Sequence, residues 1–279
     1  MGTVKELTKE QLRKMQLLEV EMVEELDRVC RKHGIKYSID GGTLLGAVRH
    51  HGFIPWDDDM DIVMLREEYE KFKKVAHEMN QDICYFQDHD VEPEYIWGYG
   101  KLRRTGTTFV RLGQEHLKFR TGVCVDVFPM DDVPKPLVCQ MFVDFYSFCL
   151  RKILWAQVAK ENSKGLKKYW WKLLSHISPD FVFKHLEWLT KKSRNDRPNR
   201  VRVLLFVSNG KLYFKSPLKE RYSMPKEWLL DLAEYDFEGK KFLGTRDYDA
   251  RLKYQYNDYM TLPPENKRES HIPFSSCNF

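Results

Sequence analysis

Apolar residues recur at helical spacing close to the start of the chain. They predict a helix from about residue 8 to residue 32, with Thr8 as its N-cap and an end at His33 and Gly34. Shorter apolar runs follow, bounded by polar or turn-forming residues. They predict four strands and one helix: strands at 35–39, 61–65, 83–87 and 123–129, and a helix at 67–79.

Two hairpins are also expected from the positions of glycine between apolar runs. They are 96–104 with 107–111 about Thr105-Gly106, and 203–207 with 212–214 about Asn209-Gly210. Short strands mixed with amphipathic helices predict an α/β (α+β) fold, with a small mixed sheet and flanking helices. The 42% share of hydrophobic residues is enough to bury a substantial core, which excludes a disordered chain.

The chain becomes richer in helical patterns after Pro134 and Pro136. The helices expected there cover 137–159, 169–176, 181–191 and 248–260. The first is long enough to span a bilayer, but polar residues interrupt it, so we expect it to pack against the core. Trp170, Trp171 and Trp188 suit either a membrane-facing patch or the core, and the core is the preferred interpretation.

These patterns divide the chain into two portions that we expect to pack together as one unit. Residues 1–134 would form the catalytic core, and residues 135–279 a basic, mostly helical portion. Residues 1–132 hold 19 Lys and Arg against 25 Asp and Glu, a net charge of −6, whereas residues 133–279 hold 27 against 16, or +11. The acidic part suits metal binding. The basic part suits either an anionic partner, such as a phosphate polymer or lipid surface, or plain solvation.

The six cysteines show no paired spacing, and no histidine stands at zinc-site spacing from them. The N-terminus is polar and does not resemble a secretory signal. We therefore expect a reduced, cytoplasmic protein, with peripheral contact at the inner membrane face as the only membrane association. No nucleic-acid partner is expected.

The segment Tyr37–Met64 carries the features that predict chemistry. Gly41 and Gly42 have no side chain to block a phosphate, and the helix expected after them directs its positive end to the same place. Thr43 adds a hydroxyl at that position. The segment therefore predicts a phosphate-binding turn.

Three carboxylates complete the expected site. Asp59 and Asp61 are two residues apart, which on a strand places both on one face. Asp126 interrupts the apolar run Val123–Pro129, where an isolated charge needs a partner. We expect the three to bind Mg²⁺ or Mn²⁺ for phosphoryl transfer; a buried salt bridge to an arginine is the alternative for Asp126.

Neighbouring residues have less specific expectations. Asp57 and Asp58 are either ordinary loop acids, the preferred interpretation, or residues that support the metal ligands from behind. Cations that could hold phosphate, as a guanidinium does with two bonds, are Arg49, Lys101, Arg103 and Arg104, with Lys101 and Arg103 favoured because they share one strand face. Side chains that could assist proton transfer are His50, His51 and His271.

Three segments resemble the LicD family of phosphotransferases, which is similar in turn to the polymerase-beta-like nucleotidyltransferases. They are GGTLLGAVRHHGFIPWDDDMDI, VDVFPMDDVP and NDYMTLPPENKRESH. The family pattern of a Gly-Gly or Gly-Ser turn, an acid–x–acid strand and a third acid falls here on Gly41-Gly42, Asp59, Asp61 and Asp126. One departure is Asn257, where the family usually has glycine.

The resemblance implies transfer of a phospho-alcohol from a CDP-activated donor to a sugar hydroxyl. Phosphocholine is the preferred phospho-alcohol. The acceptor would be an anionic or lipid-linked precursor of a cell-surface glycan such as teichoic acid or lipopolysaccharide. Mg²⁺ held by Asp59, Asp61 and Asp126 would bridge the donor diphosphate, whose oxygens would contact the Gly-Gly turn and Thr43. A cation (Arg49, Lys101 or Arg103) would offset charge on the CMP leaving group, and Asp126 or a histidine would take the acceptor proton.

Two other functions remain open at this stage. A nucleotidyltransferase of the same fold would have the same metal site, because both enzymes cleave a phosphoanhydride. A non-catalytic protein that binds nucleotide or glycan would need none of the three carboxylates, so their presence argues against it.

Overall fold

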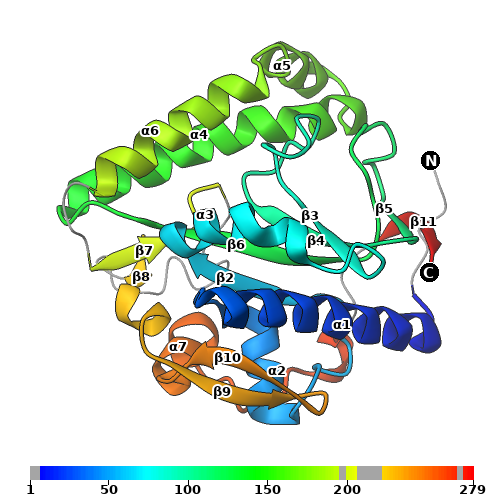
Figure 1. The fold of residues 1–279 in the computed structure, drawn as a ribbon. Coiled ribbons are helices and arrows are strands. Elements are labelled where there is room, and N and C mark those ends of the chain that lie inside the picture. The colour runs from blue at the N-terminus through cyan, green and yellow to red at the C-terminus, as the bar shows by residue number, and fades with distance from the viewer. Residues whose placement is uncertain (1–6, 195–198, 206–221, 269–272) are drawn as a thin grey trace.

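The computed structural model describes residues 7–194, 199–205, 222–268 and 273–279 of the 279-residue chain. Figure 1 shows helices on both sides of a twisted sheet. The helices are α1 (Lys9–His33), α2 (Gly41–His50), α3 (Arg66–Val75), α4 (Leu137–Asn162), α5 (Leu166–Leu174), α6 (Pro179–Arg194) and α7 (Tyr248–Tyr256). Short 3-10 turns occupy Ala76–Glu78, Lys226–Leu229 and Glu265–Lys267.

The main sheet is mixed, which confirms the α/β (α+β) prediction. Its strands are β1 (Ser38–Ile39), β2 (Asp61–Leu65), β3 (Cys84–Gln87), β4 (Gly100–Arg104), β6 (Cys124–Asp132), β7 (Arg200–Arg202), β8 (Met224–Pro225), β9 (Leu232–Phe237) and β10 (Lys240–Thr245). They run in the order β3-β4-β6-β2-β1-β10-β9, with β7 joining β6 to β8. β6 is parallel to β2 and antiparallel to β4, so the centre of the sheet mixes both directions. Strands from both portions of the chain share this sheet.

Helix α1 forms where the periodicity predicts it. The Thr8 hydroxyl accepts a hydrogen bond from the Gln11 backbone N–H at 3.2 Å, and the Gln11 side chain accepts one from the Thr8 N–H at 3.0 Å. Gly34 ends the helix with φ +64°, a left-handed conformation that glycine adopts without steric cost. The capping residues therefore set both ends of α1.

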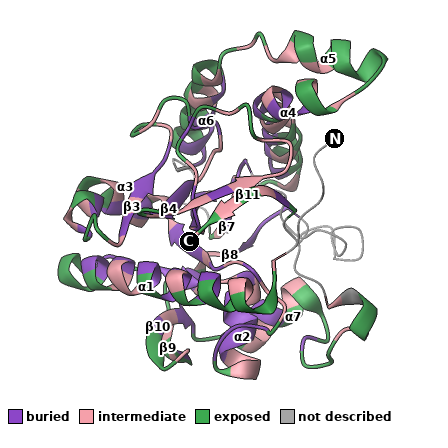
Figure 2. Cartoon of the chain, turned by 90° about the vertical axis from the view of Figure 1, so that its right-hand side faces the viewer, coloured by how far each residue is buried: buried purple, intermediate pink, exposed green. Residues whose placement is uncertain are grey.

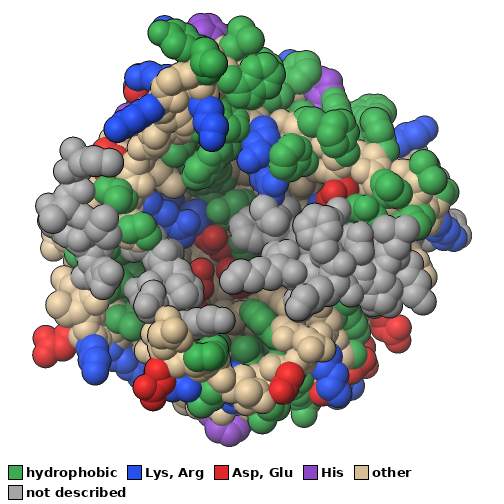
Figure 3. Space-filling model, turned by 180° about the vertical axis from the view of Figure 1, so that it is seen from behind, with side chains coloured by type: hydrophobic (Ala, Val, Ile, Leu, Met, Phe, Trp, Pro, Cys, Tyr) green, Lys and Arg blue, Asp and Glu red, His purple; other side chains and the backbone are tan. Residues whose placement is uncertain are grey.

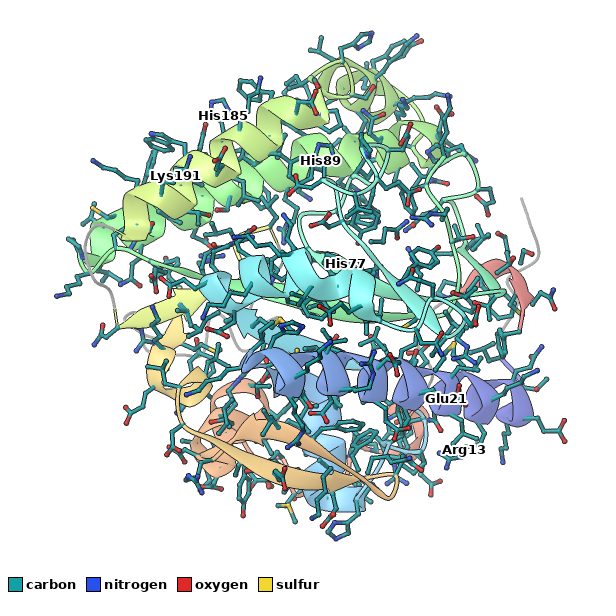
Figure 4. All side chains as sticks on the ribbon, viewed as in Figure 1. Arg13, Glu21, His77, His89, His185 and Lys191 are labelled. Carbon is teal, nitrogen blue, oxygen red and sulfur yellow. The ribbon has the colours of Figure 1, made fainter. Side chains whose placement is uncertain are left out.

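The buried side of α1 covers one face of the sheet at β4 and β6, and Figure 2 colours the buried segments of this helix purple. Its outer residues form ion pairs: Glu21 with Arg104 of β4 at 2.8 Å, and Arg13 with Glu238 at 2.6 Å. Figure 4 shows Arg13 and Glu21 along this helix. Helices α4 and α6 pack on each other around a small separate core, and α6 contacts β6. The central strands thus lie between two helical layers.

The expected hairpin between 96–104 and 107–111 is wrong. β5 (Thr108–Arg111) pairs with β11 (Phe274–Asn278) near the C-terminus, whereas β4 pairs with β3 and β6. The turn at Gly106 forms, but it leads β5 away from the main sheet. Most of the second expected hairpin, 203–214, lies outside the described residues.

The packing expected for the aromatic helices is also wrong in part. Trp170 and Trp188 are 57% and 52% exposed, and Trp171 is only half-buried. Helix α4 buries one apolar side, as expected, but a second apolar side faces outward. Among the described residues, no helix combines the length and the apolar character needed to cross a bilayer.

The departure at Asn257 has a clear structural context. Asn257 follows α7 with φ +63°, which disfavours most residues other than glycine. Its ψ of −106° lies outside the left-handed helical region that asparagine tolerates, so this backbone conformation is strained. The turn forms here nevertheless, without the glycine that is usual in the LicD family.

The stability of the core rests on α1, and we predict that Leu26→Ala lowers the free energy of unfolding by about 2–5 kcal/mol. Leu26 is fully buried, so its truncation leaves a cavity against the sheet. Leu17→Ala on the same helix is the matched control, because Leu17 is 45% exposed. Urea unfolding measures both variants; equal losses would show that α1 does not anchor the core.

Candidate functional site

The strand register places three charged residues in one row across the middle of the sheet. Asp61 of β2 lies beside Asp126 of β6, and Asp126 lies beside Lys101 of β4. Lys101 and Asp126 form an ion pair between their Nζ and Oδ1 atoms, and both side chains are buried. The salt bridge considered for Asp126 thus exists, but its partner is a lysine.

The loop before β2 adds more carboxylates to this row. Oxygens of Asp57, Asp58 and Asp59 lie within 4.8 Å of one another. Burial and the charge of Asp59 raise the pKa of Asp57 to about 8, and burial and Asp126 raise that of Asp59 to about 6. The structure groups Asp57 and Asp58 with Asp59, which fits the alternative that they support a metal site.

Of the three predicted ligands, only Asp59 belongs to this group of acids; Asp126 does not, and neither does Asp61. Burial and the charges of Asp59 and Asp126 raise the pKa of Asp61 well above the ordinary value for aspartate. Because of these raised pKa values, the acids resist being deprotonated at the same time when no cation is bound. Closely spaced oxygen ligands that repel one another fit a hard divalent cation such as Mg²⁺ or Mn²⁺.

Gly41 and Gly42 begin α2 directly against the carboxylates. A Cβ at Gly41 would lie 2.9 Å from Asp61 Oδ2, and one at Gly42 would lie 2.5 Å from Asp57 Oδ2. Gly41 also has φ +57°. The glycine pair therefore makes room for carboxylates next to the positive end of a ten-residue helix.

Thr43 is buried, and its hydroxyl accepts a hydrogen bond from the Asp61 backbone N–H at 2.8 Å. This contact fixes the start of β2 to the first turn of α2. Asp40 forms an ion pair with Arg251 of α7. Two other nitrogens of the buried Arg251 guanidinium, Nε and Nη1, have no hydrogen-bond partner among the described residues.

The cations expected to bind phosphate lie in different places. Lys101 is in the charged row, and Arg103, two residues along β4, donates to the Gln87 side chain at 2.7 Å and to the Gly122 carbonyl at 3.0 Å. Arg49 is in the last turn of α2 and donates to the Tyr259 carbonyl at 2.7 Å. The structure thus brings Lys101 to the carboxylates and holds Arg49 at the opposite end of α2 from the glycine pair.

A cavity of about 360 Å³ opens beside Lys101, between β4, β5 and α4. Its aromatic walls are Trp97, Tyr99, Phe109, Phe119 and Trp155, and its cationic residues are Lys101, Arg103, Arg111, Arg151 and Lys152. None of its described lining residues is an Asp or Glu. On the face seen in Figure 3, acidic side chains lie at the base of a hollow, with Lys or Arg side chains on one side of it.

The positive charges of this cavity are only partly offset by negative charges nearby. Burial and the neighbouring Arg202 lower the pKa of Arg151, which is the effect expected where cations crowd together. Burial would lower the pKa of Arg111 as well, but Cys124 and Asp126 raise it. Such a cavity favours an anionic ligand with a flat ring, because arginine binds phosphate and aromatic walls stack on rings.

Sequence reasoning missed Asp57, Arg111 and Arg251 as site residues. The run Asp57-Asp58-Asp59 was the available signal for the first. Arg111 and Arg251 gave no local signal, because their positions depend on β5 pairing with β11 and on α7 packing against α2. His50 stays beside Arg49, and burial and that guanidinium lower its pKa; His271 lies outside the described residues.

Comparison with known proteins found a relative that spans nearly the whole chain. Residues 34–152 match the LicD/FKTN/FKRP nucleotidyltransferase domain family. The chain is 31% identical over 269 residues to the lipopolysaccharide cholinephosphotransferase LicD of Haemophilus influenzae, covering 93% of this chain and 95% of that protein. A 40-residue segment is 49% identical to human ribitol 5-phosphate transferase FKRP, covering 14% of this chain and 8% of that protein.

The raised carboxyl pKa values predict that divalent cations stabilise the protein more at pH 8 than at pH 5. In the metal-free protein, Asp57 and Asp59 hold protons more tightly when folded than when unfolded, so their contribution to stability is lost as pH rises through about 6 to 8. A bound cation replaces those protons and removes the repulsion. The increase in melting temperature on adding MgCl₂ or MnCl₂ should therefore grow across this range.

Asp59→Asn should reduce the increase in melting temperature that MgCl₂ or MnCl₂ causes. Asp236→Asn, on the exposed surface of β9, is the matched control and should show the same increase as the wild-type protein. A pH-independent effect, or one equal in both variants, would contradict binding at the cluster.

Proposed function

Because the chain belongs to the LicD family, we propose that it is a metal-dependent phosphotransferase that acts on glycans. Its donor is a CDP-activated alcohol, for which CDP-choline is the preferred candidate. Its acceptor is a sugar hydroxyl of a cell-surface glycan precursor. The observation that carries this proposal is the carboxylate cluster placed directly beside a cationic, aromatic cavity. The chain matches a cholinephosphotransferase over 95% of that protein's length, which supports choline over ribitol as the head group of the donor.

The cavity suits the nucleotide end of the donor. Trp97 and Trp155 have ring centroids 5.9 Å apart, and they offer apolar faces to a pyrimidine ring. Arg111 and Arg151 would face the phosphate of the CMP portion. The volume of about 360 Å³ lies within the range of small-ligand sites.

A divalent ion would be held by Asp59 and Asp61, with Asp126 as the third carboxylate and Asp57 nearby. Crowded carboxylate oxygens support such an ion: those of Asp57, Asp58 and Asp59 lie within 4.8 Å of one another, and the Asp61 carboxylate lies against Gly41. When bound, the ion neutralises charge on the diphosphate and orients it. The N-terminus of α2 adds backbone N–H groups on the same side.

The protein's own residues then account for the transfer. Lys101 offsets negative charge as the CMP group leaves, from a position already next to Asp126. The sugar hydroxyl attacks the phosphorus that carries the alcohol, and it must lose a proton. Asp57, which lies in the carboxylate group with Asp59, is a candidate to receive that proton, because Asp126 is paired with Lys101.

The acceptor is an anionic or lipid-linked glycan, such as a precursor of lipopolysaccharide or teichoic acid. The net charge of +11 in residues 133–279 supports an anionic partner. We place the reaction in the cytoplasm, with peripheral contact at the inner membrane face, where lipid-linked precursors would be accessible.

We predict that the protein releases CMP from CDP-choline in the presence of Mg²⁺ and acceptor. Asp59→Asn and Asp126→Asn should each lower the rate about 100-fold or more, because the variants weaken charge stabilisation at the reacting phosphate. CDP-ethanolamine, CDP-ribitol and CDP-glycerol, assayed in parallel, define the head group. Asp236→Asn is the control and should retain the wild-type rate.

The products separate the competing functions. CMP with choline phosphate on the acceptor supports the proposal, and pyrophosphate with a nucleotide on the acceptor would instead identify a nucleotidyltransferase. Binding of the donor without any turnover in the presence of candidate acceptors would favour a non-catalytic protein.

The role of the cavity is tested by CMP binding, which requires no turnover. Arg151→Met should weaken CMP binding measured by calorimetry about tenfold, because it removes one charged hydrogen-bonding group from the cavity. Lys74→Met on the exposed side of α3 is the matched control. Unchanged affinity in Arg151→Met would place the nucleotide elsewhere.

A further inference from the structure

Helix α5 presents an apolar side to solvent. Its residues Leu166, Tyr169, Trp170 and Leu173 are 88%, 73%, 57% and 64% exposed. Their spacing of three and four residues places them on one side of the helix. No residue of α5 is buried, so packing inside this protein does not explain their apolar character.

Lysines surround this apolar side. Residues 160–172 contain five lysines (Lys160, Lys164, Lys167, Lys168 and Lys172) and a single acid, Glu161. Helical segments that lie in the interface of a bilayer combine leucine and tryptophan with lysine in this way. Isolated exposed apolar residues need no explanation, but a continuous group of this kind marks an interaction surface.

The outward side of α4 extends the surface. Val138, Phe142, Phe145 and Phe148 are 76%, 56%, 66% and 45% exposed and again follow helical spacing. Lys152 joins the two helices, because its Nζ lies 5.1 Å from the Phe148 ring centroid and 5.8 Å from that of Trp171 in α5. We call these exposed apolar residues of α4 and α5, with the lysines of 160–172, the α4–α5 surface.

The α4–α5 surface lies on the same side of the molecule as the acidic hollow. Figure 2 shows α5 projecting from the side opposite α1, and Figure 3, which views that side, shows apolar side chains with Lys and Arg above the hollow. A planar partner that covers this surface would therefore lie next to the candidate site.

We propose that the α4–α5 surface docks on an anionic lipid bilayer. The aromatic and leucine side chains enter the boundary between headgroups and acyl chains, and the lysines contact lipid phosphates. Charge complementarity favours this partner over a second copy of the chain, because two copies would oppose their lysines across the interface. The inference does not depend on the reaction that the enzyme catalyses.

Co-sedimentation with vesicles tests the proposal with the full chain. Wild-type protein should bind vesicles of phosphatidylcholine with phosphatidylglycerol and bind phosphatidylcholine alone much more weakly. The double variant Lys167→Ala/Lys168→Ala should partition about 25-fold more weakly onto the anionic vesicles, at about fivefold for each lysine. Added salt should weaken wild-type binding more than binding of this variant.

The apolar contribution is tested by Leu166→Ser/Trp170→Ser, which should lose binding to anionic vesicles. Leu17→Ser/Leu230→Ser is the matched control, because these residues are 45% and 50% exposed outside the α4–α5 surface. Melting temperatures should be unchanged in the lysine and α5 variants, since the substituted side chains are exposed.

Other results would overturn the proposal. These are absence of wild-type binding to anionic vesicles, or binding by the Leu166→Ser/Trp170→Ser variant equal to that of wild type. A dimer in sedimentation velocity that Leu166→Ser/Trp170→Ser disrupts, without vesicle binding, would assign the surface to a second copy. CMP release in solution is a separate measurement, so a failure of the catalytic proposal remains distinguishable.

Discussion

Repulsion among closely spaced carboxylates is the interaction on which the site depends. Burial and the charges of neighbouring aspartates raise the pKa of Asp57, Asp59 and Asp61. A lysine and an arginine nearby offset this charge only in part, because the pKa values of all three acids stay high. The site therefore has the properties of a cation site, and the glycine pair at the start of α2 makes room for its carboxylates.

The two sides of the charged row differ in a way that fits one extended substrate. Carboxylates occupy the β2 side, and the cationic, aromatic cavity lies on the β4 and β5 side, with Lys101 between them. A nucleoside diphosphate derivative has a ring, which aromatic walls can stack upon, and phosphates, which need both cations and a metal. The strand register thus produces an arrangement that fits the donor we propose.

The apolar residues of the second half of the chain serve two purposes. Those facing inward on α4 and α6 form a separate small core, which places Arg151 and Lys152 over the cavity. Those facing outward on α4 and α5 are left in water, at a cost that a folded protein normally avoids. The same helices thus complete the cavity and expose a surface suited to a lipid interface.

Local sequence determined the elements and part of the site. Capping residues and periodicity defined α1, and the glycine pair with Asp59, Asp61 and Asp126 marked the site, because these signals depend on neighbours along the chain. Tertiary structure decided which strands pair, so only the fold shows that Lys101 meets Asp126 and that β11 holds Arg111 at the cavity. It also decided that Trp170 and Trp188 are exposed, because periodicity identifies an apolar side of a helix but not whether another element covers it.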